Sequence, residues 1–570
     1  MKKMLKTTRQ LAAASLALAL IVPAASAFAQ ETPSAGAQPV TGIAKPAGDN
    51  RAVAPSAATV PLREYSEAIG GAVVWNAAES SAIVFRGNVK VIAKIGDSVL
   101  KVNEKSIPLE EPVRLVNEKT IVPLSALNEA FGVRAGWDAA KDAVVAGKDD
   151  YPLLASGFIN AWNKGNLAQA RSYMNSSFSK LMPDELLQQY WANVGSMYGE
   201  LGPLFSAGQS TSPVHRNVAL LYQTEASAME MTVRFDTYGQ IDDLFLSSSP
   251  SGDDFIKPAY DKPELYTEKD VTIGDGALAL PGTLTTPAGK GPFPVVVLVH
   301  GSGPNDRDET IGGVKTFRDI AVGLAAQGIA TLRYEKVTRE HSLKVQLSGK
   351  SLTANEETVD DAVRAIGLMK RTEGIDPSRI YVAGHSQGGM LMPRIIEAAK
   401  NDGLKGAIVL AGPSRPLEDL ILEQLKFQFE LVKQSGQPVD MFEQQLALYE
   451  QQVKLLKDPK YTVGNPPPGF LLGDPAWWLD IRNLYAGEAS KNQKVPLLVV
   501  QGGNDAQVFP DNLDGWKKSL SSRTDVEYKL YPKLNHTLVE FDGPSTGAEY
   551  ATPANVPDYL ITDMAKWIKH

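Results

Sequence analysis

The sequence predicts an α/β protein in which a mainly parallel sheet with a helical lid follows two small α+β domains. From residue 256 onward, short aliphatic runs alternate with stretches of helical spacing, which is typical of a parallel sheet covered by helices on both faces. Residues 59–148 contain an internal repeat, and residues 149–255 place helices before alternating strands. The 570 residues, 43 % of them hydrophobic, suffice for several domains with buried cores.

Composition excludes several classes of protein. The 65 acidic residues outnumber the 57 basic ones and give a net charge of −8, which argues against a nucleic-acid partner. The chain has no cysteine, so disulfides, thiolate metal sites and a cysteine nucleophile are excluded. Only six histidines are available as a catalytic base.

The first 29 residues predict an export signal of the Gram-positive type. Four basic residues among the first nine precede an apolar run over 11–25, and small residues then offer cleavage after Ala27 or Ala29. The run is shorter than the roughly 20 residues that a membrane span needs. We therefore expect a mature chain without a transmembrane span, secreted or associated with the cell wall, in which residues 30–58, rich in Ala, Pro, Gly and Ser, form a flexible linker.

The repeat in residues 59–148 has an offset of 62 residues. Val60-Pro61-Leu62 recurs as Val122-Pro123-Leu124, and Trp75 recurs as Trp137. Each copy predicts a short helix, a glycine turn and strands. The segment resembles the copper amine oxidase N-terminal-like domain of secreted Gram-positive proteins. It contains no histidine, which excludes a copper site of any usual kind, so we interpret it as a spacer or a wall-associated module.

Residues 149–255 predict a small α+β domain. Helical spacing over 151–163, 166–174 and 183–198 precedes alternating strands over 218–223, 228–235 and 241–246. The segment resembles an uncharacterised domain, NTF2-like or cystatin-like in pattern, that often precedes secreted hydrolases. We interpret His215 as a packing or surface histidine.

Residues 256–570 form the predicted mainly parallel sheet. Strands are predicted over 294–299, 328–333, 380–383, 406–410, 496–501 and 526–531, with helices such as 316–327, 355–372 and 390–400 between them. An insertion over 413–485 contains two further helical stretches, 417–435 and 439–457, and is the predicted lid.

The strand over 380–383 runs into Gly384-His385-Ser386-Gln387-Gly388, after which a helix is predicted. Gly-x-Ser-x-Gly at a strand-to-helix turn lifts the serine hydroxyl above the sheet, and the glycines leave room for the strained turn. Ser386 is therefore the predicted nucleophile.

A serine nucleophile needs a base to remove its proton and an acid to orient that base. The histidines after Ser386 are His536, which follows the last predicted strand, and His570 at the chain end. Asp505 follows the preceding strand, so Asp505 and His536 both lie at carboxyl ends of parallel strands, where ligand sites gather. We predict His536 as general base and acid and Asp505 as the orienting acid.

An oxyanion hole needs two backbone N–H donors. Gln387, the residue after the nucleophile, is the first predicted donor, and Ser302 in the loop after strand 294–299 is the second, with Gly303 as its alternative. We expect His300 and His385 to pack or hydrogen-bond within their own loops.

Two other polar features of the catalytic segment are a charged stretch over 305–308 and His341. The charged stretch Asn305-Asp306-Arg307-Asp308 either contacts substrate or satisfies its own charges as an ion-paired loop. His341 lies in a polar stretch, and we expect it to be solvated.

These motifs carry a family resemblance. Residues 270–570 resemble the α/β-hydrolase superfamily, specifically secreted serine esterases near the prolyl-oligopeptidase-like and bile-acid-conjugating acyltransferase-like branch, through His300–Asp308, Arg333–Lys336, Gly384–Gly389, Leu497–Val508 and Asn535-His536. The family usually follows Arg-Tyr with Asp-Lys-Arg-Gly, whereas this chain has Glu335-Lys336-Val337-Thr338, which alters the neighbouring pocket wall. The resemblance implies an α/β-hydrolase fold that needs no metal and no organic cofactor.

The lid supplies aromatic surface for substrate binding, and Trp477 and Trp478 are the predicted contacts, although such aromatics also pack lids onto cores. We expect a secreted carboxylesterase that cleaves small-molecule esters through an acyl-enzyme. The alternatives are a serine peptidase of the prolyl-oligopeptidase type and an acyltransferase. An inactive wall-associated binding protein is a further reading, which the intact Ser386, Asp505 and His536 disfavour.

Overall fold

A computed structural model of the chain describes residues 59–138, 143–147, 149–225, 227–247, 255–436 and 438–570. The predicted export signal and linker, residues 1–58, lie outside them. The chain divides after Pro250 into two compact units, which are described separately. No helix in the described ranges is both long enough and apolar enough to cross a membrane.

The repeat of the first unit is visible as paired elements. Helices α2 (Leu62–Ala68) and α3 (Leu124–Phe131) each begin at the leucine of a Val-Pro-Leu motif. The strands that contain the two motifs, β1 and β8, pair antiparallel with Val60 opposite Val122, so the two copies face each other. The strands of this segment are β1 (Thr59–Pro61), β2 (Ala72–Asn76), β3 (Ser81–Arg86), β4 (Val89–Lys94), β5 (Val99–Val102), β6 (Lys105–Pro108), β7 (Arg114–Val116), β8 (Lys119–Pro123), β9 (Ala135–Asp138) and β10 (Ala143–Ala146).

Four helices and a four-stranded antiparallel meander complete this unit. The predicted helices are α4 (Tyr151–Asn163), α5 (Leu167–Ser172) and α7 (Asp184–Tyr198), and the predicted strands are β12 (Arg216–Thr224), β13 (Ala228–Phe235) and β14 (Ile241–Ser247). Helix α6 (Ser176–Leu181) and strand β11 (Leu201–Thr211) were not predicted. His215 is buried with its Nε2 2.8 Å from Asp242 Oδ2, so it packs inside the domain.

The second unit is built on an eight-stranded sheet with the order β15-β16-β20-β17-β21-β22-β23-β24. The last six strands of that order run parallel and include every strand that the sequence predicted, whereas the antiparallel β15 and β16 were missed. Their bounds are β15 (Tyr266–Ile273), β16 (Leu280–Pro287), β17 (Phe293–Val299), β20 (Ala330–Tyr334), β21 (Ile375–His385), β22 (Gly406–Leu410), β23 (Leu497–Gly502) and β24 (Val526–Tyr531).

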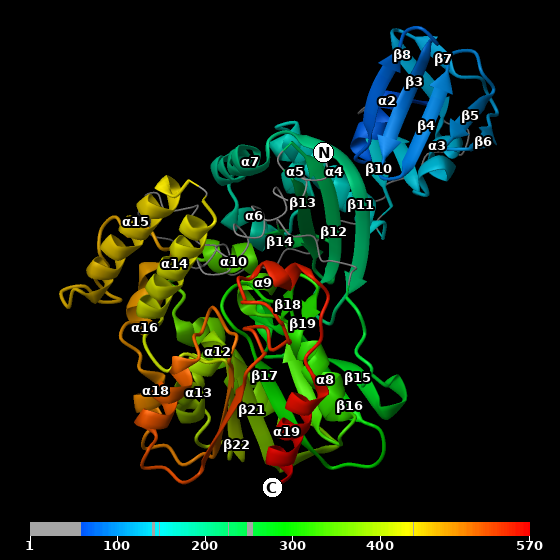
Figure 1. Ribbon diagram of the computed structural model, residues 1–570. Coiled ribbons are helices and arrows are strands. Elements are labelled where there is room, and N and C mark those ends of the chain that lie inside the picture. The colour runs from blue at the N-terminus through cyan, green and yellow to red at the C-terminus, as the bar shows by residue number, and fades with distance from the viewer. Residues whose placement is uncertain (1–58, 139–142, 148, 226, 248–254, 437) are drawn as a thin grey trace, which may run out of the picture. The chain divides into compact units, whose positions relative to one another are not determined.

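Helices bury both faces of this sheet, as the continuous apolar runs predict. In β17, Val295 and Val297 belong to the core under α11 (Asp360–Met369), α13 (Met392–Ala398) and α18 (Asp511–Ser519). Val296 and Leu298 point the other way, into the core under α8 (Thr316–Ala325) and α19 (Asp558–Lys569). Figure 1 shows α8 and α19 on one side of the sheet and α13 and α18 on the other.

The insertion after β22 is helical, as predicted. Helices α14 (Leu417–Gln434) and α15 (Asp440–Lys457) form an adjacent pair beyond the sheet, drawn in yellow in Figure 1. The shorter α16 (Pro475–Ile481) and α17 (Ala486–Ala489) return the chain to β23. Further short elements of this unit include β18 (Thr310–Ile311), β19 (Val314–Lys315), α9 (Val337–Glu340), α10 (Ser342–Leu347) and α12 (Gln387–Met390).

Candidate active site

Ser386 occupies a strained turn between β21 and α12. Its φ of 51° and ψ of −116° are rare for a residue with a side chain, and such strain persists at functional sites. A Cβ on Gly384 would lie 2.4 Å from the backbone of Gly388, and one on Gly388 would lie 2.5 Å from the carbonyl oxygen of Val299. Both glycines are therefore required for the turn to pack against β17.

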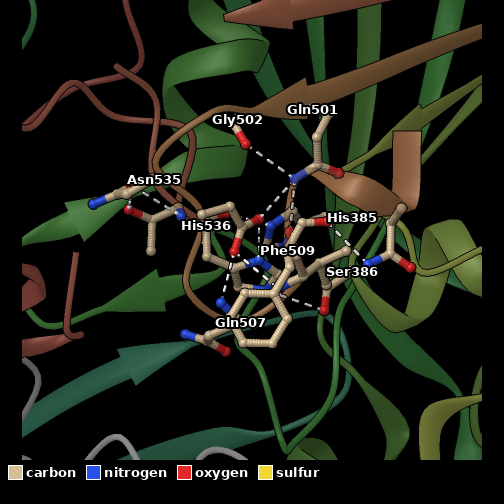
Figure 2. Close-up of polar contacts among 12 residues, drawn as sticks. His385, Ser386, Gln501, Gly502, Gln507, Phe509, Asn535 and His536 are labelled. Carbon is tan, nitrogen blue, oxygen red and sulfur yellow. Dashed lines mark hydrogen bonds and ion pairs between the residues drawn. The ribbon is translucent and has the colours of Figure 1, made fainter. Parts of the chain in front are cut away.

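The structure brings the three predicted catalytic residues together. His536 Nε2 lies 3.1 Å from Ser386 Oγ (Figure 2), and His536 Nδ1 lies 2.9 Å from Asp505 Oδ2. The three residues follow the ends of β21, β23 and β24, at the same edge of the parallel sheet. Hydroxyl, imidazole and carboxylate thus form a hydrogen-bonded chain in which the imidazole can take the hydroxyl proton while the carboxylate orients the imidazole.

Asp505 is buried and held by its own loop. Its Oδ1 accepts the backbone N–H groups of Gln507 and Val508, each at 2.8 Å, which leaves Oδ2 for His536. The side-chain amide of Gln501 lies 3.3 Å from the same Oδ2 (Figure 2). No role was predicted for Gln501 from the sequence, and its place at the end of β23 is the one signal that points to it.

Asn535 sets the shape of the histidine loop. Its buried Oδ1 accepts the backbone N–H groups of Thr537 and Val539, at 3.1 and 3.3 Å, and the hydroxyl of Thr537. Leu538 adopts a φ of 62°, so the chain turns back sharply after His536. These bonds fix the direction from which the imidazole approaches Ser386.

The two predicted oxyanion donors flank the nucleophile. Ser302 lines the same pocket as Ser386, and Gln387 begins the helix directly after it. Across the part of the chain that the structure describes, neither backbone N–H donates to a protein acceptor. The preceding Gly301 N–H is occupied, since it donates to Glu309 Oε1 at 2.7 Å. Gly303 does not line the pocket, which favours Ser302 over it.

A buried ion pair lies behind His536 and was missed by the sequence analysis. His385 Nδ1 is 3.1 Å from Glu309 Oε2, and His385 Nε2 donates to the backbone carbonyl of His536 at 2.8 Å. Burial opposes the charged form of both groups, but Glu309 raises the pKa of His385, and His385 lowers the pKa of Glu309. The expectation that His385 bonds within its own loop was wrong, because its partners come from two other loops.

The charged loop after β17 is not an internally paired loop. Arg307 Nε donates to Glu335 at 2.8 Å, and Asp308 pairs with Arg333. Arg333 and Glu335 lie at the end of β20, so ion pairs join the motif Asn305–Asp308 to the motif Arg333–Lys336. His300 Nε2 donates to the Asp306 carbonyl at 3.0 Å, within its own loop as expected.

His341 was expected to be solvated, and that expectation was wrong. It is 1 % exposed, and its Nε2 lies 2.8 Å from the carbonyl oxygen of Ala279. It lies between α9 and α10, and Ala279 directly precedes β16, one of the strands that the sequence analysis missed.

The pocket beside Ser386 is walled mainly by aliphatic side chains. The first turns of α14 supply one wall, and the end of β21 and the loops after β17, β22, β23 and β24 supply the rest, with apolar lining from Ile311, Pro413, Leu417, Leu420, Ile421 and Val508. Trp477 and Trp478 are not among the described residues that line it. They pack in the core, where Trp477 donates to Glu357 at 2.6 Å and Trp478 to the Leu472 carbonyl at 2.7 Å. The described residues contain no group of three or more His, Asp or Glu side chains placed to hold a metal ion.

Two segments of this chain match known protein families. Residues 291–542 match the family described as serine aminopeptidase, S33, and residues 52–146 match the copper amine oxidase N-terminal domain. Esterase EstD of Thermotoga maritima is 38 % identical over 337 residues, which are 59 % of this chain and 75 % of the relative. A protease inhibitor of Brevibacillus choshinensis is 30 % identical over 105 residues, 18 % of this chain and 32 % of that protein. Among solved structures, Est1E from Butyrivibrio proteoclasticus is 17 % identical with a TM-score of 0.33 and covers 53 % of this chain and 99 % of its own.

Proposed function

The chain belongs to the α/β-hydrolase family of Esterase EstD, enzymes that act on esters, and we propose that it is a secreted serine carboxylesterase. The observation that carries this proposal is the hydrogen-bonded chain Ser386–His536–Asp505 beside the backbone N–H groups of Ser302 and Gln387, which have no acceptor among the described residues.

The geometry supports acyl transfer in two steps. His536 Nε2 takes the proton of the Ser386 hydroxyl as Oγ attacks the ester carbonyl carbon. The carbonyl oxygen becomes an oxyanion that accepts the N–H groups of Ser302 and Gln387. The tetrahedral intermediate then breaks its bond to the alkoxy oxygen, which receives the proton from His536 and departs as the alcohol. A water molecule repeats the sequence on the acyl-enzyme and releases the acid.

Asp505 keeps the imidazole ready for both steps. Its Oδ2 accepts Nδ1–H of His536, so Nε2 is the unprotonated nitrogen that faces Ser386. When His536 gains the serine proton, the buried carboxylate stabilises the imidazolium. Behind it, the charges of Glu309 and His385 neutralise each other, and His385 hydrogen-bonds the backbone carbonyl of His536.

The pocket supports an ester with an aliphatic group as the small-molecule substrate. The acidic residue among its described lining is Glu309, whose oxygens face Gly301 N–H and His385, so it is not free to bind a substrate ammonium group. A serine aminopeptidase needs a partner for the amino terminus of its peptide. The S33 family match nevertheless makes peptide hydrolysis the second candidate function.

Export and wall association belong to the same proposal. The basic start and apolar run before residue 29 support secretion, and the copper amine oxidase N-terminal domain supports association with the cell wall. Expression in a Gram-positive host followed by mass measurement of the protein in the medium tests this. A chain that begins after Ala27 or Ala29 is expected, and an uncut chain retained inside the cell contradicts it.

Hydrolysis of p-nitrophenyl esters from acetate to laurate tests the catalytic proposal. We expect the Ser386→Ala variant to lose roughly 10³-fold or more in kcat with its melting temperature preserved. A variant that keeps its ester hydrolysis refutes the proposed nucleophile. Release of p-nitroaniline from aminoacyl anilides, at rates above those of the esters, indicates the peptidase instead.

A further inference from the structure

Lys336 and Glu357 form a buried ion pair beside the site that the mechanism above does not use. Lys336 is 2 % exposed and Glu357 8 %, and Nζ lies 2.9 Å from Oε1. Lys336 directly precedes α9, and Glu357 lies in a π-helical turn, Asn355–Val359, a feature that often marks functional sites. Burying two charges carries a desolvation cost that good geometry and further hydrogen bonds must offset.

The lysine end of the pair holds the loop that carries Ser302. Lys336 Nζ donates to the carbonyl oxygen of Gly301 at 2.9 Å, and Asn305 Nδ2 reaches the same oxygen at 3.2 Å. A trans peptide is planar, so the Gly301 C=O and the Ser302 N–H point in opposite directions. Fixing the carbonyl toward Lys336 therefore fixes the direction of the Ser302 N–H.

The glutamate end holds the other donor. Glu357 Oε2 accepts the side-chain amide of Gln387 at 2.9 Å and the indole N–H of Trp477 at 2.6 Å. Gln387 is the first residue of α12, and the carbonyl of Ser386 before it accepts Met390 N–H at 2.9 Å. The side chain and the preceding carbonyl of Gln387 are thus both anchored, which leaves its own N–H facing away from the helix.

We propose that the Lys336–Glu357 pair positions both donors of the oxyanion hole. This inference rests on the proposed esterase function and assigns the pair a positioning role, since neither side chain lines the pocket. One ion pair connects two segments that are far apart in sequence, so the spacing between Ser302 and Gln387 depends on it. The ammonium group also polarises the Gly301–Ser302 peptide and makes its N–H a stronger donor.

The test compares an ester with its thiono analogue, in which sulfur replaces the carbonyl oxygen. Sulfur accepts hydrogen bonds weakly, so the thionoester gains less from the donors. We expect Lys336→Met to lower kcat for p-nitrophenyl butyrate about 10- to 100-fold, with KM changed by less than about twofold, and to lower kcat for the thionoester much less. The ratio of the two rates is a readout that a general loss of packing does not move.

Further variants separate positioning from stability. Glu357→Gln combined with Lys336→Met leaves no isolated buried charge, and Trp477→Phe removes a single donor from Glu357. Both are expected to lower the ratio, the second only a few-fold, and they carry the test if a single charge variant does not fold. The control is Arg523→Met, which breaks a half-buried ion pair with Asp525 near the amino-terminal ends of β23 and β24. It is expected to lower the melting temperature and leave the ratio unchanged.

The outcomes distinguish this inference from the function on which it rests. If the wild-type protein hydrolyses the ester through Ser386 and every folded variant of the pair keeps the wild-type ratio, the positioning role is wrong and the esterase stands. If Ser386→Ala retains ester hydrolysis, the function itself fails. If Arg523→Met lowers the ratio of ester to thionoester rates as much as the pair variants do, the change reflects a general loss of stability and the proposal is wrong.

Discussion

His300 is a histidine held in its neutral form. It directly precedes Gly301 and Ser302, which begin the loop that carries one proposed oxyanion donor and is called the oxyanion loop below. Its ring packs 5.3 Å, centroid to centroid, from both Phe317 and Tyr334, and its Nε2–H donates to the Asp306 carbonyl. Burial lowers its pKa to about 4, and the nearby Lys336 acts in the same direction, although Glu309 opposes them. The oxyanion loop is thereby attached to a residue that stays uncharged at neutral pH.

The lowered pKa of His300 predicts that the free energy of unfolding decreases at acid pH. Between pH 6.5 and about 4 an unfolded histidine binds a proton that folded His300 does not, so the free energy of unfolding falls as the pH falls. The contribution reaches about 1.4 kcal/mol per pH unit and is fully present above pH 6.5. Urea unfolding of wild type and His300→Gln at pH 4.5, 5.5, 6.5 and 7.5 measures it.

The difference between the two proteins isolates this histidine. Burial raises the pKa of Asp319 to about 7, which gives a slope of opposite sign, but that group is present in both proteins. We expect the free energy of unfolding to fall less steeply toward acid pH in His300→Gln. Parallel curves for the two proteins contradict the assignment.

The residues of the proposed triad could be predicted from the sequence, and the residues that support them could not. Ser386 lies in a local motif, and chain order with few histidines selects His536. Glu309, Lys336 and Glu357 have no such signal, because their roles depend on contacts with residues 21 to 76 positions away. From sequence alone, an acidic or basic residue in a polar stretch is predicted to lie at the surface, because the partner that allows it to be buried is known only from the fold.

Among the elements, α14 connects the lid to the chemistry. Leu417, Leu420 and Ile421 lie on one side of its first two turns and line the pocket beside Ser386. Leu425, one turn further on, is equally part of the buried core but does not line the pocket. The start of this helix therefore sets the size of the pocket, while its continuation contributes packing alone.

Two truncations on this helix separate pocket size from packing. We expect Ile421→Ala and Leu425→Ala each to lower the free energy of unfolding by about 2–5 kcal/mol, because each leaves a buried cavity. Only Ile421→Ala is expected to shift the preferred p-nitrophenyl ester toward longer acyl chains, since it removes a pocket wall. The profile from acetate to laurate measures the shift. An identical shift in Leu425→Ala contradicts the assignment of this wall, as does an unchanged profile in both.

Elements with strong periodicity were predicted, and weakly patterned ones were missed. The central strands are buried on both faces, so their apolar runs are unmistakable. Strand β15 is exposed along most of its length, and β11 is rich in glycine and serine and exposed along its second half. Trp477 and Trp478 were read as pocket residues because nothing in the sequence distinguishes an aromatic side chain that packs a lid from one that faces substrate.

At the scale of the whole molecule, the two units have separate cores. The sheet of the second unit has one apolar cluster on each face, made entirely from residues after 270. The first unit has a cluster that includes Leu153 of α4 along with the repeat segment. Leu204 of β11 also bonds Gly70 and Gly87, at 2.7 and 2.8 Å. The segments predicted as two domains, 59–148 and 149–255, therefore lie within one compact unit as far as residue 250.

Separate cores predict separate unfolding and an independent catalytic unit. Because all the described site residues lie after residue 300, a chain of residues 255–570 is expected to hydrolyse p-nitrophenyl esters with kcat/KM within about twofold of the full chain. Tryptophan fluorescence follows both units, since Trp75, Trp137, Trp162 and Trp191 report on the first and Trp477, Trp478, Trp516 and Trp567 on the second. The full chain is expected to unfold in urea in two transitions, one with the midpoint of the fragment. A fragment without activity, or with a midpoint well below either transition, shows that the first unit supports the catalytic one rather than serving as a spacer.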